Sequence, residues 1–446
     1  MLPSSDTSAY HAGMRVVYLA AGAGGMYCGS CLRDNRLAAT LIAQGRDLIL
    51  VPLYTPLRTD DAPVATGRIY YGGINVFLQQ WSRLFRLMPR FMDRILDAPA
   101  LIRRVARGAG GTRPETLGAL AASVLRGVQG AQRKELDKLV AGLRDLNPDL
   151  INLPNLMFLG VAEPLKTALR VPVLCTLSGE DVFIDRLPQP YRAEVIELIR
   201  RQAAHVDGFV AVTRYYVERA VEHFDLPADR MHYVPMGVLV QPSIQERPPH
   251  DSPFTIGYLA RICPDKGLHT LAEAFAILRQ AGRNCRLRVA GYLDRADRPY
   301  LQSMLDKAEA AGIADAIEVV GEVDRQGKLR FLRSLDVLSV PASYPEAKGF
   351  YVLEALACGV PVVQPRQGSY PELIEQTGGG LLCDPDEPQS IADALARLMD
   401  DPSMREALGR RGQAAVAEEF TADIMADRTW ALYERFVQKR DPSVAS

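Results

Sequence analysis

Short runs of aliphatic and β-branched residues alternate with amphipathic helical patterns along nearly the whole chain. The runs predict strands at residues 15–20, 47–54, 149–154, 171–179, 208–213, 254–260, 285–292, 316–323, 337–342 and 360–365. Continuous apolar runs are typical of strands buried on both faces of a parallel sheet. Because helical patterns separate them, we expect repeated strand–helix–strand units and an α/β fold.

The runs fall into two groups separated by a polar, proline-rich stretch at residues 241–253. This stretch predicts a linker between two Rossmann-like, doubly wound domains, at residues 1–240 and 254–420. A chain of 446 residues is also too long for one hydrophobic core. Ligands of such sheets bind at the carboxyl ends of the strands, so we expect the domains to face each other across a cleft.

Composition narrows the class of protein. The 52 basic and 53 acidic residues almost cancel, which argues against a basic nucleic-acid coat, so no nucleic-acid partner is expected. The seven cysteines have no regular spacing and favour a reduced, cytoplasmic setting. Residues 1–13 lack the apolar core of a signal peptide, and no run of 18 apolar residues is long enough to span a membrane.

Residues 81–130 depart from the strand–helix rhythm and predict a helical insertion. Arginines recur among apolar residues between positions 83 and 107. Such a basic amphipathic segment can lie on an anionic membrane surface, which would place the protein at the inner membrane face. An ordinary helix pair, half buried on its own domain with its arginines in water, explains the same pattern.

The first predicted strand leads into a glycine-rich turn. Gly24 and Gly25 leave their amides open to a phosphate or a sugar hydroxyl, just before a helix expected to begin at about Leu32. Cys28 and Cys31 lie in the same turn. They fit a redox pair, half of a metal site, or simply two small side chains in a crowded loop.

Two further turns follow predicted strands. Ser178 lies at the end of the run at 171–179 and Asp181 just after it, where both would point into the cleft, although Asp181 also suits a helix cap. Arg261 and Lys266 follow the first strand of the second domain. Two cations there can hold a diphosphate, whereas the alternative is a surface ion pair with Asp265.

A fourth segment places two carboxylates around a helix start. Glu346 precedes the helix and Glu354 lies within it. The amides of Gly349, Phe350 and Tyr351 would face an anion at the helix N-terminus. A carboxylate beside that anion site suits sugar hydroxyls.

Taken in order, these pieces resemble the retaining family 4, or group 1, glycosyltransferases of the two-Rossmann GT-B fold. The ordered set is the glycine-rich turn, TLSGED at 176–181, GYLARICPDKG at 257–267, LEALACGVPVV at 353–363 and GSYPELIEQTGGGLLCDPDEP at 368–388. The resemblance covers most of the chain and is strongest after Phe254.

The resemblance implies a role for each matching position. Arg261 and Lys266 would bind the donor diphosphate, Glu346 the hydroxyls of the donor sugar, and Glu354 the ribose. The amides of Gly349, Phe350 and Tyr351, with Gly24, Gly25, Ser178 and Asp181, would complete the donor site. The family also implies a C-terminal helix, at 421–438, that crosses back to the first domain before a tail at 439–446.

The chain departs from the family at the sugar end of the site. Ser178 stands where many relatives carry a histidine, and Lys348 is added beside the donor. Asp384 and Asp386 form an Asp-x-Asp sequence, but they follow a late strand and suit a turn, so no catalytic metal is expected.

With this resemblance, the predicted function is metal-independent transfer of a hexose-like sugar from a UDP- or GDP-sugar, and the resemblance implies that the transfer is retaining. The sequence does not identify the acceptor, for which a small molecule, a glycan and a lipid-linked molecule are all open. A noncatalytic protein that binds nucleotide sugars, and a thiol or metal module built on Cys28 and Cys31, are the alternatives.

Overall fold

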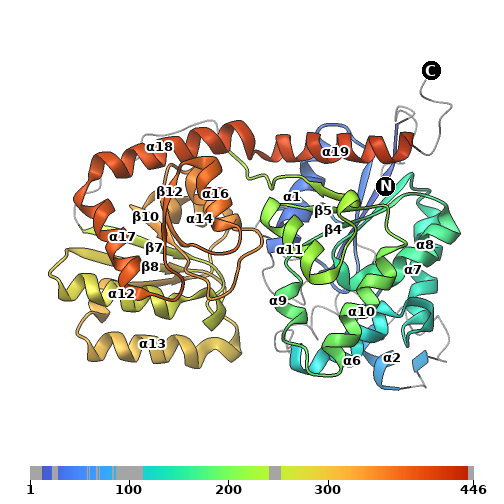
Figure 1. Ribbon diagram of the computed structural model, residues 1–446, viewed down its shortest axis with the longest axis horizontal. Helices are drawn as coiled ribbons and strands as arrows, with labels where there is room; N and C mark the ends of the chain where they lie inside the picture. The colour runs from blue at the N-terminus through green and yellow to red at the C-terminus, as the bar shows by residue number, and fades with distance from the viewer. Residues whose placement is uncertain are drawn as a thin grey trace, which may run out of the picture.

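The computed structural model describes residues 13–22, 29–57, 59, 61–66, 69, 71–82, 85–86, 114–240 and 253–439. Two six-stranded parallel sheets, each covered by helices, lie next to each other along the molecule (Figure 1). They confirm the predicted α/β fold of two doubly wound domains.

The first sheet has the strand order β2-β1-β3-β4-β5-β6. Its strands are β1 (Val16–Ala20), β2 (Leu48–Pro52), β3 (Leu150–Leu153), β4 (Val173–Thr176), β5 (Gly208–Ala211) and β6 (Met231–Tyr233). The first sheet reverses its order between β1 and β3, which are paired in parallel, so this is the point at which helices lie on opposite faces.

The second sheet has the order β12-β11-β10-β7-β8-β9. Its strands are β7 (Phe254–Leu259), β8 (Cys285–Ala290), β9 (Ile317–Gly321), β10 (Val337–Ser339), β11 (Val362–Pro365) and β12 (Gly380–Cys383). The central switch is between β7 and β10. The short strands β6 and β12 are not among the apolar runs that predicted the other ten.

Helices cover both faces of both sheets. Those of the first domain are α1 (Gly29–Ala43), α2 (Gly73–Trp81), α6 (Pro114–Leu125), α7 (Arg133–Asp145), α8 (Ala162–Leu169), α9 (Asp181–Ile184), α10 (Tyr191–Ala203) and α11 (Arg214–Phe224). The others are α12 (Leu268–Gln280), α13 (Arg298–Ala310), α14 (Arg325–Arg333), α15 (Phe350–Ala357), α16 (Tyr370–Thr377), α17 (Pro388–Asp400), α18 (Pro402–Glu419) and α19 (Ala422–Gln438).

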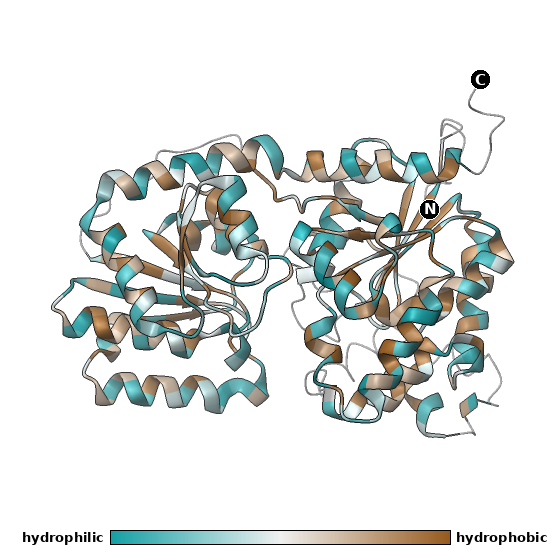
Figure 2. Ribbon diagram, in the orientation of Figure 1, coloured by the Kyte–Doolittle hydropathy of each residue, from teal (hydrophilic) through white to brown (hydrophobic). Residues whose placement is uncertain are grey.

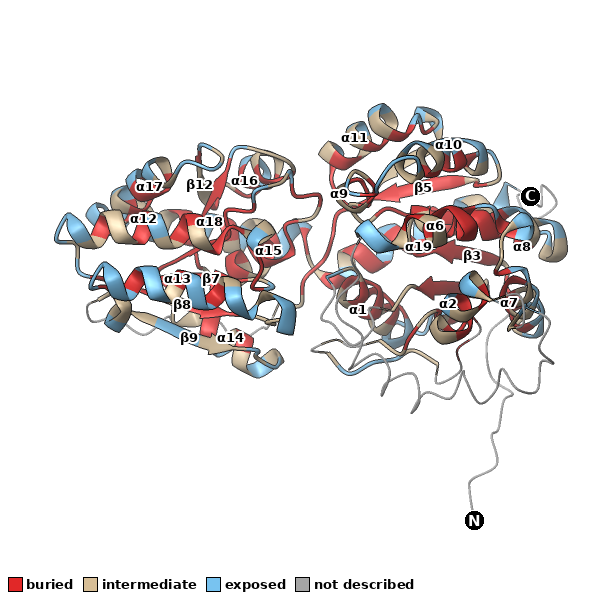
Figure 3. Ribbon diagram, turned by 90° about the horizontal axis from the view of Figure 1, so that it is seen from below, coloured by how far each residue is buried: buried red, intermediate tan, exposed pale blue. Residues whose placement is uncertain are grey.

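The continuous apolar runs form the interior of both domains. The strands β1, β3 and β4 are buried along their whole length, and the first sheet is largely brown in the hydropathy view and red in the burial view (Figures 2 and 3). The strand β9 closes one edge of its sheet and is partly exposed, as an edge position allows. Burial on both faces is the reason that these strands show no alternation of polar and apolar residues.

The last helix leaves the second domain and packs on the first. Met425, Trp430 and Tyr433 of α19 are buried in one cluster with Val16 and other apolar residues of the first sheet and α1 (Figure 1). The chain crosses where the backbone of Val238 bonds to Phe420 and Ala422, at 2.8 and 2.9 Å. Two chain segments therefore connect the domains on this side.

Two local expectations need adjustment. The helix after the glycine-rich turn begins at Gly29, three residues before the predicted start near Leu32, so that Ser30 lies in its first turn. Of the predicted insertion, the end of α2, residues 85–86, α6 and the following turn are described. The linker at 241–252 and most of the arginine-rich stretch at 83–107 lie outside the described residues.

Candidate active site between the two domains

The turn after β7 carries Lys266 to the centre of the second domain's carboxyl edge. Gly267 ends this turn with φ +69°, and a Cβ atom there would lie 1.7 Å from the carbonyl oxygen of Pro341. Only glycine fits such a backbone and such a contact. The turn therefore packs directly on the loop that follows β10 and contains Glu346.

Lys266 and Glu346 form a buried ion pair, with side chains 16% and 6% exposed. The hydroxyl of Tyr344 also donates to the Glu346 carboxylate, at 3.1 Å. Burial alone would raise the pKa of Glu346, but the charge of Lys266, followed by that of Lys348, lowers this pKa to about 2. Burial would lower the pKa of Lys266, but Glu346 raises it well above its usual value. Both groups are thus charged at neutral pH.

Arg261 is the second predicted cation of this turn. Its Nε donates to the sulfur of Cys263 at 3.3 Å, and no carboxylate of the described residues lies within 4 Å of its guanidinium. The alternative partner, Asp265, instead binds Arg186 of the first domain through two hydrogen bonds of 2.7 and 2.9 Å. Arg261 therefore keeps its charge available for a ligand.

The helix α15 begins directly behind this pair. Gly349 precedes it with φ +64°, and a Cβ atom there would lie 2.6 Å from Leu373. The amides of Gly349, Phe350 and Tyr351 are the first of the helix and have no helical carbonyl partner. The sharp turn at Gly349 thus places a helix N-terminus beside the buried charges of Lys266 and Glu346.

Glu354 lies further along α15 and has two cationic neighbours. Lys328 of α14 donates to its Oε1 at 2.6 Å. Arg36 of α1, in the other domain, lies 3.7 Å from the same oxygen. Arg36 also bonds Asp61 at 3.0 Å and stacks over the Phe350 ring at 4.9 Å. The predicted ribose carboxylate is therefore shared between the domains.

The first domain contributes the loop after β4. The carbonyl of Ser178 accepts a hydrogen bond of 2.7 Å from the ammonium group of Lys348, across the interface. Asp181 is buried and binds Tyr216 and Arg219 of its own domain, both at 3.1 Å. It is the first residue of α9, not its cap. Ser178 thus faces the second domain, whereas Asp181 stabilises its own loop.

Behind Ser178 lie residues that the sequence analysis did not select. Arg33 is fully buried, pairs with Asp34, and donates to the carbonyl of Leu177 at 3.1 Å. Glu180 accepts from the amide of Ser178 at 2.9 Å, and burial raises the pKa of Glu180. Arg33 and Asp34 are adjacent and oppositely charged in the first turns of α1. This pair is the sequence signal that could have indicated a buried ion pair behind the site.

The interface between the domains is closed around the site. Thr213 donates to the carbonyl of Ala347 at 2.9 Å, and Ala347 is packed in the core of the first domain. Glu372 of α16 accepts from the amides of Arg214 and Tyr215 at 2.9 Å each. These contacts hold the segment at 346–348 against the end of β5.

Three predicted residues, Gly24, Gly25 and Cys28, lie outside the described part of the chain. Cys31 is buried in α1. Asp384 and Asp386 lie in the loop between β12 and α17, where Asp386 takes φ +55°. Among the described residues, no three His, Cys, Asp or Glu side chains are grouped so as to hold a metal ion.

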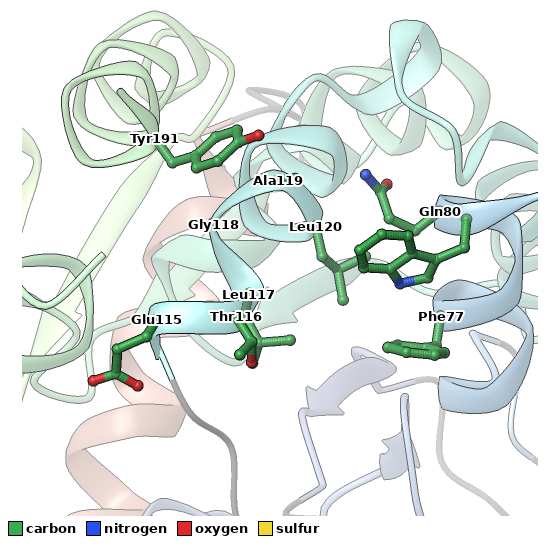
Figure 4. A pocket seen from close by; sticks show the side chains of 10 residues that line it. Phe77, Gln80, Glu115, Thr116, Leu117, Gly118, Ala119, Leu120 and Tyr191 are labelled. Atoms are coloured by element: carbon green, nitrogen blue, oxygen red, sulfur yellow. The ribbon is translucent and has the colours of Figure 1, made fainter. Parts of the chain in front are cut away.

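A separate groove of about 170 Å³ lies on the first domain between α2, α6 and the start of α10 (Figure 4). Phe77, Trp81 and Tyr191 line it, and the first two are 51% and 72% exposed. None of the predicted site residues lines this groove. Within the described residues, no helix is long and apolar enough to cross a membrane.

Two family models match successive parts of the chain. The model for glycosyltransferase family 4 matches residues 105–241, and the model for group 1 glycosyl transferases matches residues 240–415. The chain belongs to the group 1 glycosyltransferases. The two matches meet between the domains, so each Rossmann-like half of the family is represented.

Similar proteins support the same family. A D-inositol 3-phosphate glycosyltransferase of Paenarthrobacter aurescens is 31% identical over 60% of this chain and 65% of its own length. A GDP-mannose-dependent phosphatidylinositol monomannoside mannosyltransferase of Mycobacterium tuberculosis is 27% identical over 57% of this chain and 67% of its own. The chain spans between about half and two thirds of the length of the curated relatives that it matches.

The fold of this group 1 glycosyltransferase also has solved counterparts. The Anabaena protein HepE, solved in complex with UDP and glucose, has a TM-score of 0.65 at 17% identity. The alignment covers 94% of this chain and 99% of that protein. At this identity the likeness establishes the GT-B arrangement of two Rossmann-like domains.

Proposed function

We propose that the protein transfers a glycosyl unit from a nucleoside-diphosphate sugar, of the UDP or GDP type, to an acceptor with retention of anomeric configuration. The observation that carries this proposal is the buried Lys266–Glu346 pair beside the N-terminus of α15, opposite Ser178. The names of the relatives and the UDP bound by HepE support a nucleotide-sugar donor.

In this proposal the cations act on the leaving group. The bond between the anomeric carbon and the phosphate oxygen breaks, and its electrons pass to the diphosphate. Arg261, Lys266 and the first amides of α15 stabilise the negative charge that develops there. Because these groups are fixed before the reaction, little reorganisation opposes the step.

The acceptor oxygen attacks the same face from which the diphosphate leaves, and a phosphate oxygen takes the acceptor's proton. No side-chain nucleophile and no metal ion are required. Glu346 is held as a carboxylate and can accept hydrogen bonds from sugar hydroxyls, while Glu354 accepts from the ribose. Contact between the domains excludes water, which would otherwise compete as acceptor.

The first test is calorimetric binding of UDP, GDP and ADP, each with and without EDTA. We expect one nucleotide to bind specifically and its affinity to survive EDTA. If EDTA abolished the binding, the metal-independent mechanism would be wrong. If no nucleotide bound, the proposed function itself would fail.

Turnover separates an enzyme from a noncatalytic sensor. The nucleotide that binds is offered as its sugar conjugate, and release of the free nucleoside diphosphate is followed with water or a simple sugar as acceptor. The anomeric configuration of the product, read by NMR, tests retention. A Cys28→Ser, Cys31→Ser double variant with unchanged release would eliminate the thiol module.

We also propose a peripheral contact with anionic lipid through the arginine-rich segment at 83–107, with the acceptor presented at that surface. The exposed aromatic pair Phe77 and Trp81 lies immediately before this segment, with ring centroids 6.2 Å apart. Arg86 donates to the carbonyls of Gln79 and Gln80 at the end of α2, so its loss would also disturb that helix.

Flotation with vesicles containing anionic lipid tests this contact. Arg90, Arg94 and Arg104 are changed together to Glu, and Arg86 is left in place. We expect the variant to stay at the bottom of the gradient while the wild-type protein floats. Wild-type protein that does not float would exclude the contact and leave transfer itself untouched.

A further inference from the structure

Lys348 places an ammonium group at the meeting point of the two domains. Its Nζ donates to the carbonyl of Ser178 at 2.7 Å and to the hydroxyl of Ser30 at 2.9 Å. Both acceptors are neutral, and both belong to the first domain. Since an ammonium group has three donors, one remains for a ligand.

The other cations of the cleft differ from Lys348 in having a carboxylate partner. Lys266 pairs with Glu346, Lys328 with Glu354, and Arg186 with Asp265. Apart from Arg261, Lys348 is the cleft cation for which the described residues provide no carboxylate within 4 Å. A half-buried ammonium group without a counter-ion is costly, so an anion that arrives there gains free energy.

The two nearest carboxylates are already committed. Glu346 accepts the backbone amide of Lys348 at 3.2 Å, but its charge is paired with Lys266. Glu180 accepts from the amide of Ser178 and from Tyr216 within the first domain. Neither is within 4 Å of the Lys348 ammonium group. Lys348 therefore acts on both carboxylates only at longer range and forms no direct ion pair with either.

The position of Lys348 is also fixed. Ala347 before it is buried in the first domain and bonds Thr213, while Gly349 after it forms the tight turn into α15. The side chain therefore leaves an anchored backbone and ends on Ser30 and Ser178 of the first domain, whereas Lys266 ends on Glu346 of its own domain. That direction separates it from the cations assigned to the diphosphate.

Resting on the proposed function, we propose that Lys348 selects a substrate with an acidic group on one of the two sugars that meet beside Ser178. The group is a carboxylate or a phosphate. It belongs either to the donor sugar, as in a uronic acid, or to a phosphorylated acceptor. In both cases the ammonium group gains the counter-ion that the protein does not supply.

Calorimetry with matched probes tests this specificity. The donor pair is UDP-glucose and UDP-glucuronate or, if GDP is the nucleotide that binds, GDP-mannose and GDP-mannuronate. The acceptor pair is myo-inositol and myo-inositol 3-phosphate, each with the bound nucleoside diphosphate. We expect the acidic member of one pair to bind at least tenfold more tightly, and the pair concerned identifies the source of the anion.

The preference should fall to about twofold in Lys348→Met and persist in Lys348→Arg, which keeps the charge. Lys166→Met serves as control, because Lys166 pairs with Asp207 at the amino end of the first sheet, away from the cleft.

A wild-type protein with no preference in either pair, or a preference that survives in Lys348→Met, overturns the proposal. So does a Lys348→Met variant that loses affinity for UDP or GDP alone by the same factor, since the ammonium group would then serve the diphosphate. If the wild-type protein binds neither UDP nor GDP, the proposed function fails instead.

Discussion

Glu346 and Glu354 come from one short segment, yet their surroundings differ in kind. Glu346 is held entirely by its own domain, through Lys266, Tyr344 and the amide of Lys348. Glu354 is shared between Lys328 of its own domain and Arg36 of the other. The position of Glu346 is therefore fixed by the second domain alone, whereas the surroundings of Glu354 depend on the contact between the two domains.

The two carboxylates therefore suit two different roles in the site. The Glu346 side combines opposite charges with a helix N-terminus, an arrangement that stabilises charge during bond breaking. The Glu354 side joins α1 to α15 through Arg36, which also contacts Asp61 and Phe350. If a ribose binds Glu354, as we propose, it would change that joint, and nucleotide binding and domain contact would then be linked at this point.

Removal of Lys266 should have the largest effect. In Lys266→Ala we expect kcat to fall at least a hundredfold, the order lost when a group that stabilises transition-state charge is deleted. KM should change much less, because Arg261 and the α15 amides still bind the diphosphate. Steady-state kinetics of nucleotide release measures both. Lys166→Ala, which breaks an ion pair at the amino end of the first sheet, away from the cleft, is the matched control. Equal rates in the two variants would remove Lys266 from the reaction.

Loss of Glu354 should act mainly on binding. In Glu354→Ala we expect kcat/KM to fall about a hundredfold, chiefly through KM, since a buried charge-assisted hydrogen bond to ribose is lost and two cations lose their partner. Glu354→Gln keeps an oxygen acceptor and should recover part of the affinity. We expect Lys266 to act on kcat and Glu354 on KM. If Glu354→Ala lowers kcat and leaves KM unchanged, this distinction is wrong.

Much of this architecture was predictable because each central strand has its own continuous apolar run in the sequence. Buried parallel strands need continuous apolar runs, and these located every central strand. The edge strands β6 and β12 are mostly only half-buried, so neither needs the continuous aliphatic run that marks a central strand. The positions of Arg261, Lys266, Glu346 and Gly349 were likewise predictable from turns that follow strands.

What the sequence did not reveal are contacts between residues far apart in the chain. Arg36 meets Glu354 over more than 300 positions, and the Lys348 ammonium reaches Ser30 and Ser178. Such pairs depend on how the two domains face each other. The pattern of apolar and polar residues within one segment carries no information about that arrangement. Asp181 also illustrates the limit, because the sequence suggested a helix cap or a donor contact but did not reveal its hydrogen bonds to Tyr216 and Arg219.

The link through Arg36 should have a smaller effect than the loss of Lys266 or of Glu354. In Arg36→Met we expect KM for the nucleotide sugar to change about tenfold, with kcat almost unchanged, because a methionine retains contact with Phe350 but loses the charge. Arg46→Met is the control, since Arg46 also stacks on an aromatic ring, that of Trp430, and lies 3.9 Å from Glu434, outside the cleft. A change in kcat alone would place Arg36 in the chemical step and remove the distinction between the two carboxylates.

The smallest effect concerns acid stability and isolates the Glu346 side. The folded-state pKa of Glu346, about 2, lies below its unfolded value, so the ion pair stabilises the fold above pH 4.5 and this contribution is lost as pH falls toward 2. Glu346→Gln leaves Lys266 buried without its partner and should lower Tm at pH 7 by roughly 4 to 8 °C, from about 2 kcal/mol. The difference in Tm between wild type and variant should shrink between pH 4.5 and 2.

Scanning calorimetry of both proteins over that pH range tests the direction of this change. Glu354→Gln provides the comparison, because the carboxylate of Glu354 is shared between the domains. A wild-type advantage that grew as the pH fell would contradict a preorganised Lys266–Glu346 pair.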